Sequence, residues 1–190
     1  MLFRSIETTQ SILVHQGIDN TWAYAKDVER WAEIMPGFQN CEIIDDDNSL
    51  WVLKIGVGAM VRTVKVEVVV DRWAGPEEVD FHFKLKGDPV TGTGTYRAAA
   101  NGPHTDVALH VEVSGTGPLA PMWEAMGGPV LPKFAAGFAG QLKERIEAEY
   151  GVVESAAPAV AATLAPPRAC ARPGPRAAIR SEEHTSELQS

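Results

Sequence analysis

The sequence predicts an α+β fold: a curved antiparallel sheet of about seven strands, wrapped around a long C-terminal helix, with two short helices after the first strand. Three observations predict it. Apolar and polar residues alternate with period two from residue 38 to residue 113, turn residues interrupt the alternation, and the spacing of apolar residues becomes helical from residue 131 onwards.

The first elements are a strand over about residues 8–17 and the two short helices. Asp19 or Asn20 is the expected N-cap of the first helix, and Asp27 that of the second. The Met-Pro-Gly corner at 35–37 then ends the helical segment. Proline moves the residue before it out of the α region, and glycine permits a tight reversal.

Six strands are expected from residue 38 onwards, and four runs of residues among them place their apolar side chains on one face. These residues are Trp51, Leu53, Ile55 and Val57, then Val64, Val66, Val68 and Val70, then Phe81, Phe83 and Leu85, and finally Val107, Leu109, Val111 and Val113. Turns are expected at 45–49, 75–76, 87–89 and 101–103. The pattern indicates an antiparallel sheet with one dry face.

The last element is a helix that is predicted to begin at Leu131. Its apolar stripe contains Leu131, Phe134, Phe138, Leu142 and Ile146. Pro129 and Pro132 suit its first turn, and Gly151 suits its end. The stripe must lie on the dry sheet face, which is a helix-grip arrangement. We expect a space between sheet and helix, with the corner at 35–37 at its mouth, opposite residues 118–132.

The predicted domain covers residues 1–151. Residues 152–179 are rich in alanine, proline and arginine and are expected to form a disordered tail. The final segment, residues 180–190, resembles the translation of a sequencing-library adapter. We interpret it as an artefact, so the natural C-terminus is expected to differ from this one.

The composition excludes several classes of function. A net charge of −8 and a pI of about 5.1 argue against a nucleic-acid partner, since neutralising phosphates requires a clustered basic face. Cys41 and Cys170 are too far apart in sequence to indicate a disulfide framework, and the five histidines are scattered, so no metal site is predicted. No apolar run has membrane length, and a cytoplasmic protein is expected.

Four stretches of the chain resemble a known family. They are DVERWAEIMPGFQNCEII, SLWVLKIGVGAMVRTVKVEVVVDRW, FHFKLKGDPVTGTGTYRA and APMWEAMGGPVLPKFAAGFAGQLKERIE. In this order they resemble the G subunits of carbon monoxide dehydrogenase, a group within the SRPBCC superfamily, whose members are also called START-like or Bet v 1-like proteins. The likeness covers about residues 8–150.

The resemblance implies a deep hydrophobic cavity and an accessory role with a molybdenum hydroxylase of the carbon monoxide dehydrogenase type. It also implies recruitment of that enzyme to the inner face of the membrane through the C-terminal region. A lipophilic carrier such as a quinone would be handled there. No cofactor other than such a ligand is implied.

The predicted ligand-binding residues are those expected to face the cavity or its rim. They are Met35, Trp51, Leu53, Ile55, Met60, Arg62, Val64, Val66, Phe81, Phe83, Met122, Trp123, Met126, Phe134 and Phe138. The alternative is that they form a closed core. Gly137 and Gly140, inside the last helix, favour a cavity because they leave room beside the sheet.

Some members of this set have a second interpretation. Met122, Trp123 and Met126 suit a gate over an apolar ligand, or equally a packed start of the helix. Arg62 could orient a carbonyl or carboxylate from inside the cavity, but a rim or surface position is favoured because burying an unpaired charge is costly. The same applies to Glu124.

Two classes of function remain open. One is a non-catalytic carrier that binds a lipophilic molecule, and the other is an enzyme of the polyketide cyclase or dehydratase sort. Cyclisation requires a positioned acid or base in the pocket. The inward strand residues offer almost none, so no catalytic residue is predicted and the carrier is favoured. A dimerisation or chaperone-like domain would instead have a filled interior and an exposed apolar patch.

Overall fold

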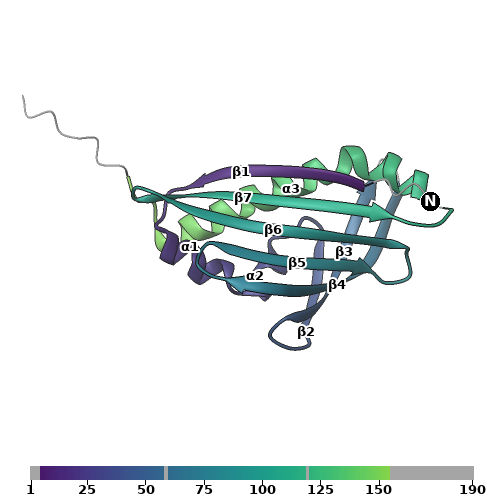
Figure 1. Ribbon diagram of the computed structural model, residues 1–190, viewed down its shortest axis with the longest axis horizontal. Helices are drawn as coiled ribbons and strands as arrows, with labels where there is room; N and C mark the ends of the chain where they lie inside the picture. The colour runs from purple at the N-terminus through teal and green to yellow at the C-terminus, as the bar shows by residue number, and fades with distance from the viewer. Residues whose placement is uncertain (1–4, 58–59, 119, 155–190) are drawn as a thin grey trace, which may run out of the picture. The chain divides into compact units, whose positions relative to one another are not determined.

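The computed structural model describes residues 5–57, 60–118 and 120–154 (Figure 1). The predicted tail at 152–179, apart from its first three residues, and the segment 180–190 lie outside this range. The elements are, in chain order, β1 Ser5–Val14, α1 Ile18–Ala25, α2 Val28–Glu33, β2 Phe38–Ile43, β3 Asn48–Val57, β4 Met60–Ala74, β5 Glu78–Leu85, β6 Val90–Asn101, β7 His104–Gly115 and α3 Ala120–Tyr150.

The seven strands form one antiparallel sheet in the order β1-β7-β6-β5-β4-β3-β2. The six-strand meander from β2 to β7 and the predicted fold class are confirmed. Helix α3 packs against β1 and β7, while β2 and β3 run across the direction of those strands in Figure 1. The sheet therefore curves around the helix, with β1 and β2 as its edges.

The core lies between the inner sheet face and the helices. Val79, Val107, Leu142 and Ile146 are almost completely buried there. Trp31, from α2, packs its ring among three other aromatic rings at centroid distances of 5.7–5.8 Å, those of Phe81, Tyr96 and Phe138. The short helix α2 thus joins the sheet to α3 through one aromatic cluster.

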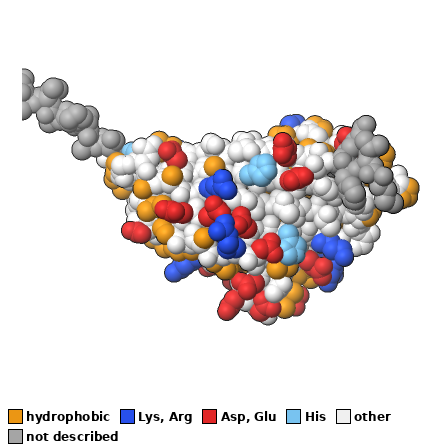
Figure 2. All heavy atoms as spheres, in the orientation of Figure 1, with side chains coloured by type: hydrophobic (Ala, Val, Ile, Leu, Met, Phe, Trp, Pro, Cys, Tyr) orange, Lys and Arg blue, Asp and Glu red, His pale blue; other side chains and the backbone are white. Residues whose placement is uncertain are grey.

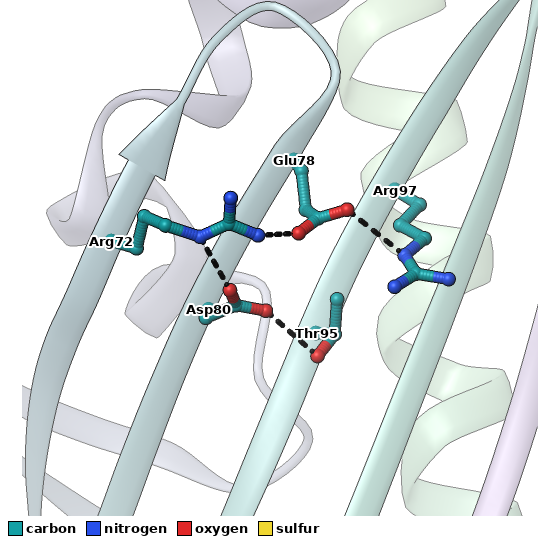
Figure 3. Close-up of polar contacts among 5 residues, drawn as sticks. All are labelled: Arg72, Glu78, Asp80, Thr95 and Arg97. Carbon is teal, nitrogen blue, oxygen red and sulfur yellow. Dashed lines mark hydrogen bonds and ion pairs between the residues drawn. The ribbon is translucent and has the colours of Figure 1, made fainter.

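The outer sheet face is polar, as the alternation predicts. Figure 2 shows acidic, basic and histidine side chains spread over this face. Figure 3 shows a network across β4, β5 and β6, in which Arg72 pairs with Glu78 and Asp80, and Arg97 pairs with Glu78. The hydroxyl of Thr95 donates to Asp80 at 3.0 Å. These contacts join the strands on the side away from α3.

The beginning of the chain differs from the prediction in two respects. Strand β1 covers Ser5–Val14 rather than residues 8–17. The N-cap of α1 is Gly17, with extended backbone angles and no side-chain cap, so the expectation of Asp19 or Asn20 is wrong. The side-chain Nδ2 of Asn20 donates to Gln16 Oε1 at 2.8 Å, so this side chain is directed back to the residue before the cap.

The N-cap predicted for the second helix is confirmed. The carboxylate of Asp27 accepts hydrogen bonds from the backbone N–H groups of Glu29 and Arg30, at 3.1 and 3.4 Å. Two of the otherwise unpaired donors of α2 are satisfied in this way.

Helix α3 is longer than predicted. It begins at Ala120 rather than Leu131, so Pro129 and Pro132 lie inside it instead of in its first turn. Each proline removes one backbone hydrogen bond, but packing against β1 continues along this part of the helix. A Cβ at Gly127 would already lie 3.0 Å from Ile6 Cδ1. At the other end, Gly151 has φ of +84° and ends the helix as predicted.

The Met-Pro-Gly corner is in contact with the middle of α3. A Cβ at Gly137 would lie 3.1 Å from Pro36 Cγ, so this glycine accommodates the corner. The backbone of Gly37 also accepts a hydrogen bond from Lys54 N at 2.7 Å. The corner is thus packed on both the helix and β3, and it touches α3 beyond the 118–132 segment that was expected to face it.

Candidate ligand-binding cavity

A cavity of about 240 Å³ lies between the inner sheet face and α3, and it is partly open to solvent. The predicted residues that line it come from the corner, three strands and the helix: Met35, Trp51, Leu53, Ile55, Val66, Phe81, Phe83, Phe134 and Phe138. The fold therefore brings nine of the predicted positions together around one space. Whether they bind a ligand remains a prediction.

Strand periodicity explains why these residues meet. Across the β3–β4 ladder, Trp51 lies opposite Val66 and Leu53 opposite Val64. Opposite residues in an antiparallel pair share a sheet face. Val64 is buried on the same face, but it does not line the cavity.

Arg62 does not line the cavity either, although it lies opposite Ile55 on the inward phase of β4. It stands near the end of the strand, and its side chain is 57% exposed. The guanidinium makes two contacts with the carboxylate of Asp88, at 2.9 and 3.0 Å. The favoured interpretation of Arg62 as a rim or surface residue agrees with this position.

Four predicted side chains, those of Met60, Met122, Trp123 and Met126, lie outside the part of the chain whose side chains are described. The backbone of 122–126 belongs to α3. The gate that these residues suggested therefore remains a prediction. Gly137 and Gly140, which were expected to leave room for the cavity, do not line it.

One stripe of α3 forms the wall opposite the sheet. Its residues are Glu124, Gly127, Leu131, Phe134 and Phe138, with Val130 and Ala135 beside them. The spacing of three and four residues keeps them on one helix face. Extending the predicted stripe backwards from Leu131 by this spacing would have found Gly127 and Glu124.

Several other lining residues were not in the predicted set. One group consists of alternating apolar strand residues that the sequence pattern had already placed on the inner face: Val68, Leu85, Leu109, Val111 and Val113. The others are Ile6, Trp31, Val90 and Gly115. The first group carried a clear sequence signal, because every second residue of a strand faces the same side. Trp31 carried no such signal, because it comes from a short helix.

The described lining is apolar with one exception. Glu124 is half-buried and is the one charged residue among the described lining residues. The favoured interpretation of Glu124 was a rim or surface residue, and a half-buried residue that lines a partly open cavity is compatible with the rim. A carboxylate accepts hydrogen bonds and can carry a negative charge, so it gives this end of the cavity a polarity that the walls lack.

Two buried polar atoms belong to Trp31, which lines the cavity, and to Tyr96, which packs against the Trp31 ring but is not a lining residue. Within the described residues, neither Trp31 Nε1 nor the hydroxyl of Tyr96 has a hydrogen-bond partner. Burial raises the pKa of the Tyr96 phenol, so this group stays protonated at neutral pH. The indole of Trp51 is satisfied, because its Nε1 donates to Ser49 Oγ at 2.9 Å.

Other reactive groups of the described chain lie away from the cavity. Burial raises the pKa of the Cys41 thiol to about 11, which keeps it protonated at neutral pH, and Cys41 is not a lining residue. No cluster of three His, Cys, Asp or Glu side chains able to hold a metal ion occurs in residues 5–57, 60–118 and 120–154. None of the helices within those ranges is long and apolar enough to cross a membrane.

A curved sheet that holds a long helix over an apolar cavity defines the START/Bet v 1-like class of helix-grip proteins. Residues 5–147 match the family model described as polyketide cyclase / dehydrase and lipid transport, and the chain belongs to this family. The predicted superfamily is thus confirmed. The description covers both enzymes and lipid transport, so membership alone does not decide between them. No curated protein matches the chain.

Solved structures share the fold at low sequence identity. A conserved protein from Geobacillus kaustophilus has a TM-score of 0.67 and 18% identity, and the match covers 76% of this chain and 97% of that one. A START superfamily protein from Mycobacterium smegmatis has a TM-score of 0.59 and 15% identity, over 75% and 98%. The Zhui aromatase/cyclase from Streptomyces sp. R1128 has a TM-score of 0.56 and 17% identity, over 78% and 100%.

Proposed function

We propose that the protein binds a compact lipophilic molecule in the cavity between the sheet and α3, and acts as a carrier or accessory protein. The observation that supports this most directly is the lining, which is apolar except for Glu124. Displacing water from such walls favours binding by about 25 cal/mol for each Å² of apolar surface buried. The described walls supply no pair of acidic and basic groups for proton transfer.

The size of the cavity limits the ligand. A volume of about 240 Å³ holds roughly eight water-sized groups, which is near the lower end for small-molecule sites. A single ring system of that size fits. A long aliphatic tail would extend through the open side of the cavity.

A narrower form of the proposal follows from the resemblance to the G subunits of carbon monoxide dehydrogenase. In this form the ligand is a quinone, whose ring occupies the cavity while its tail extends outwards. The partner is a molybdenum hydroxylase of the carbon monoxide dehydrogenase type, at the inner face of the membrane. The four sequence stretches that carry the resemblance support this form.

An enzyme of the polyketide cyclase or dehydratase sort is the second candidate. The family description supports it, and so does Glu124, because a half-buried carboxylate in an apolar cavity can exchange a proton with a ligand. Conversion of a bound polyketide by the wild type, with loss of conversion in Glu124→Gln, would favour this candidate over a carrier.

The test is native mass spectrometry of the full chain purified from cells, followed by organic extraction and identification of bound molecules. Ala135→Phe and Ala136→Phe form a matched pair of variants, because Ala135 lines the cavity while Ala136 is exposed on the same helix. A lipophilic molecule that is retained by Ala136→Phe and lost from Ala135→Phe supports the proposal. An empty wild-type protein that also fails to take up added quinone or naphthalene would overturn it.

A further inference from the structure

Glu124 continues the helix stripe that faces the cavity. Gly127, Leu131, Phe134 and Phe138 follow it at intervals of three, four, three and four residues, and all of them line the same space. At a rise of about 1.5 Å per residue, Glu124 lies roughly 20 Å along α3 from Phe138. Phe138 packs on Trp31, so the carboxylate and the aromatic cluster mark opposite ends of the helix wall.

The neighbours of Glu124 leave it room to meet a ligand. The next stripe position is Gly127, which has no side chain and approaches Ile6 of β1 closely. Gly115, at the end of β7, also lines this end of the cavity. Neither glycine has a side chain to cover the carboxylate of Glu124 from the cavity side, and Ile6 fills the space directly beside Gly127.

The chemistry of a carboxylate determines what it can recognise. When it is ionised it accepts hydrogen bonds only, and its two oxygens offer about four lone-pair sites. A contact with another part of the chain therefore still leaves acceptor capacity for a ligand. A hydroxyl or a protonated amine can donate to it, whereas a ligand carboxylate would bring a second negative charge into apolar surroundings.

We propose that Glu124 determines the ligand class: a compact apolar molecule with a hydrogen-bond donor at one end, a hydroxyl or a protonated amine, and not a carboxylate. This inference rests on the proposed function, since it requires that the cavity takes a ligand. It assigns one residue to the polar end of that ligand and the remaining walls to its apolar body. A quinone has only acceptor oxygens, so within the narrower form of the proposal this inference favours the hydroquinone, whose hydroxyls can donate.

The test uses four probes that share one ring system: naphthalene, 2-naphthol, 2-(aminomethyl)naphthalene and 2-naphthoate. Isothermal titration calorimetry at neutral pH gives their affinities for the wild-type full chain. We expect the amine and the naphthol to bind more tightly than naphthalene, and the naphthoate most weakly. The amine should exceed the naphthoate by at least about tenfold, because hydrogen bonds to charged groups contribute that much.

Three variants separate recognition from packing. Glu124→Gln keeps the shape and removes the charge, so the preference for the amine over the naphthoate should fall about tenfold. Glu124→Lys should reverse the preference. Glu144→Gln is the control, because Glu144 is exposed on α3, where it accepts a hydrogen bond from Gln141. It should leave all four affinities unchanged.

The outcomes distinguish this inference from the proposed function. If all four probes bind and Glu124→Gln keeps the wild-type order and ratios, Glu124 is not the recognition residue and the inference is overturned alone. If naphthalene and its derivatives all fail to bind the wild type, the proposed function is overturned and the inference with it. A loss of preference in Glu124→Gln, with naphthalene affinity unchanged, supports both.

Discussion

Phe83 on β5 lies directly opposite Gly92 on β6, and its phenyl ring occupies the space that a side chain at position 92 would take. Phe81 and Gly94 repeat this arrangement two residues along the ladder. Both rings line the cavity. The two glycines therefore allow the rings to lie over β6, and so they set the shape of the cavity wall.

Replacing these glycines should disturb the cavity to different degrees. In Gly94→Ala the three atoms nearest to the new methyl all belong to the ring of Phe81. That ring can move into the cavity, so we expect weaker binding of naphthalene with a modest loss of stability. In Gly92→Ala the methyl also lies 2.6 Å from the backbone oxygen of Glu112. Because backbone yields less than a ring, this variant should lose more, about 1–3 kcal/mol of unfolding free energy.

Urea denaturation and naphthalene binding measure the two effects. Gly128→Ala is the control, because a Cβ at that position would meet no atom of the described residues within 4 Å beyond its own neighbouring helix backbone. Alanine in a helix should be neutral there, or stabilising by up to about 1 kcal/mol. Equal stability losses in Gly92→Ala and Gly94→Ala would contradict the explanation based on the Glu112 backbone.

The residues that line the walls of the cavity were predicted more accurately from the sequence than the residues at the ends of the cavity. Alternation in strands fixes which residues share a face, so Trp51, Leu53 and Val66 were placed correctly on the inner side. Alternation does not say where a strand leaves the protein interior. By alternation Arg62 belongs to the inward-facing residues of β4. It lies near the end of that strand, however, where its guanidinium reaches solvent and pairs with Asp88.

The start of α3 could not be predicted from local signals. Pro129 and Pro132 are unfavourable within a helix. The packing of α3 on β1 stabilises the helix across these prolines, and this packing cannot be recognised in the local sequence. Placing the helix start at Leu131 left Glu124 outside it. The predicted stripe therefore did not include the one charged residue of the described lining.

The cap of α2 should contribute measurably to stability. In Asp27→Ala the backbone N–H groups of Glu29 and Arg30 lose their acceptor, so we expect the unfolding free energy to fall by about 1 kcal/mol. Asp27→Asn should retain most of it, since asparagine caps equally well. Urea denaturation of each variant provides the measurement.

Asp19→Ala is the matched control for this prediction. Asp19 lies in the first turn of α1, where Gly17 is the N-cap, so its loss should cost less than that of Asp27. If Asp27→Ala and Asp19→Ala lose the same amount of unfolding free energy, the hydrogen bonds that cap α2 add nothing to the effect of a negative charge near a helix N-terminus. The prediction would then be contradicted.

The network on the outer face should make stability depend on acid pH. The hydrogen bond from Arg72 to Asp80 holds the pKa of the Asp80 carboxyl below its ordinary value of 3.8. A carboxyl whose pKa is lower in the folded state stabilises the fold above its unfolded pKa, and this stabilisation is lost as the pH falls through the folded value. The unfolding free energy should therefore decrease as the pH falls below 3.8.

Arg72→Gln removes the partner of Asp80, together with the ion pair between Arg72 and Glu78. At neutral pH the variant should be less stable than the wild type, and the difference should shrink as the pH falls below 3.8, because Asp80 is then protonated in both proteins. Urea denaturation over a pH series measures it, with Lys84→Gln, exposed on the same strand as Asp80, as the control. A difference that is constant over the whole series would assign the role of Arg72 to packing rather than to charge.

Tyr96 provides a test of a buried polar group. It is completely buried beside Trp31, and its hydroxyl has no hydrogen-bond partner within the described residues. A buried unsatisfied hydroxyl costs about 1–3 kcal/mol. We therefore expect Tyr96→Phe to raise the unfolding free energy by about 1 kcal/mol in urea denaturation.

The same variant has a second signature at alkaline pH. Burial raises the pKa of Tyr96 above its ordinary value of 10.0, so the folded protein keeps a proton that the unfolded chain releases. The unfolding free energy of the wild type therefore keeps its full value below pH 10.0 and decreases as the pH rises from there through the pKa of Tyr96 in the folded protein. Tyr24 and Tyr150 remain in both proteins, so the comparison isolates Tyr96. Urea denaturation over an alkaline series should show the advantage of Tyr96→Phe growing with pH. A destabilised Tyr96→Phe at neutral pH would instead mean that the hydroxyl bonds a bound group, such as a ligand oxygen or an ordered water molecule.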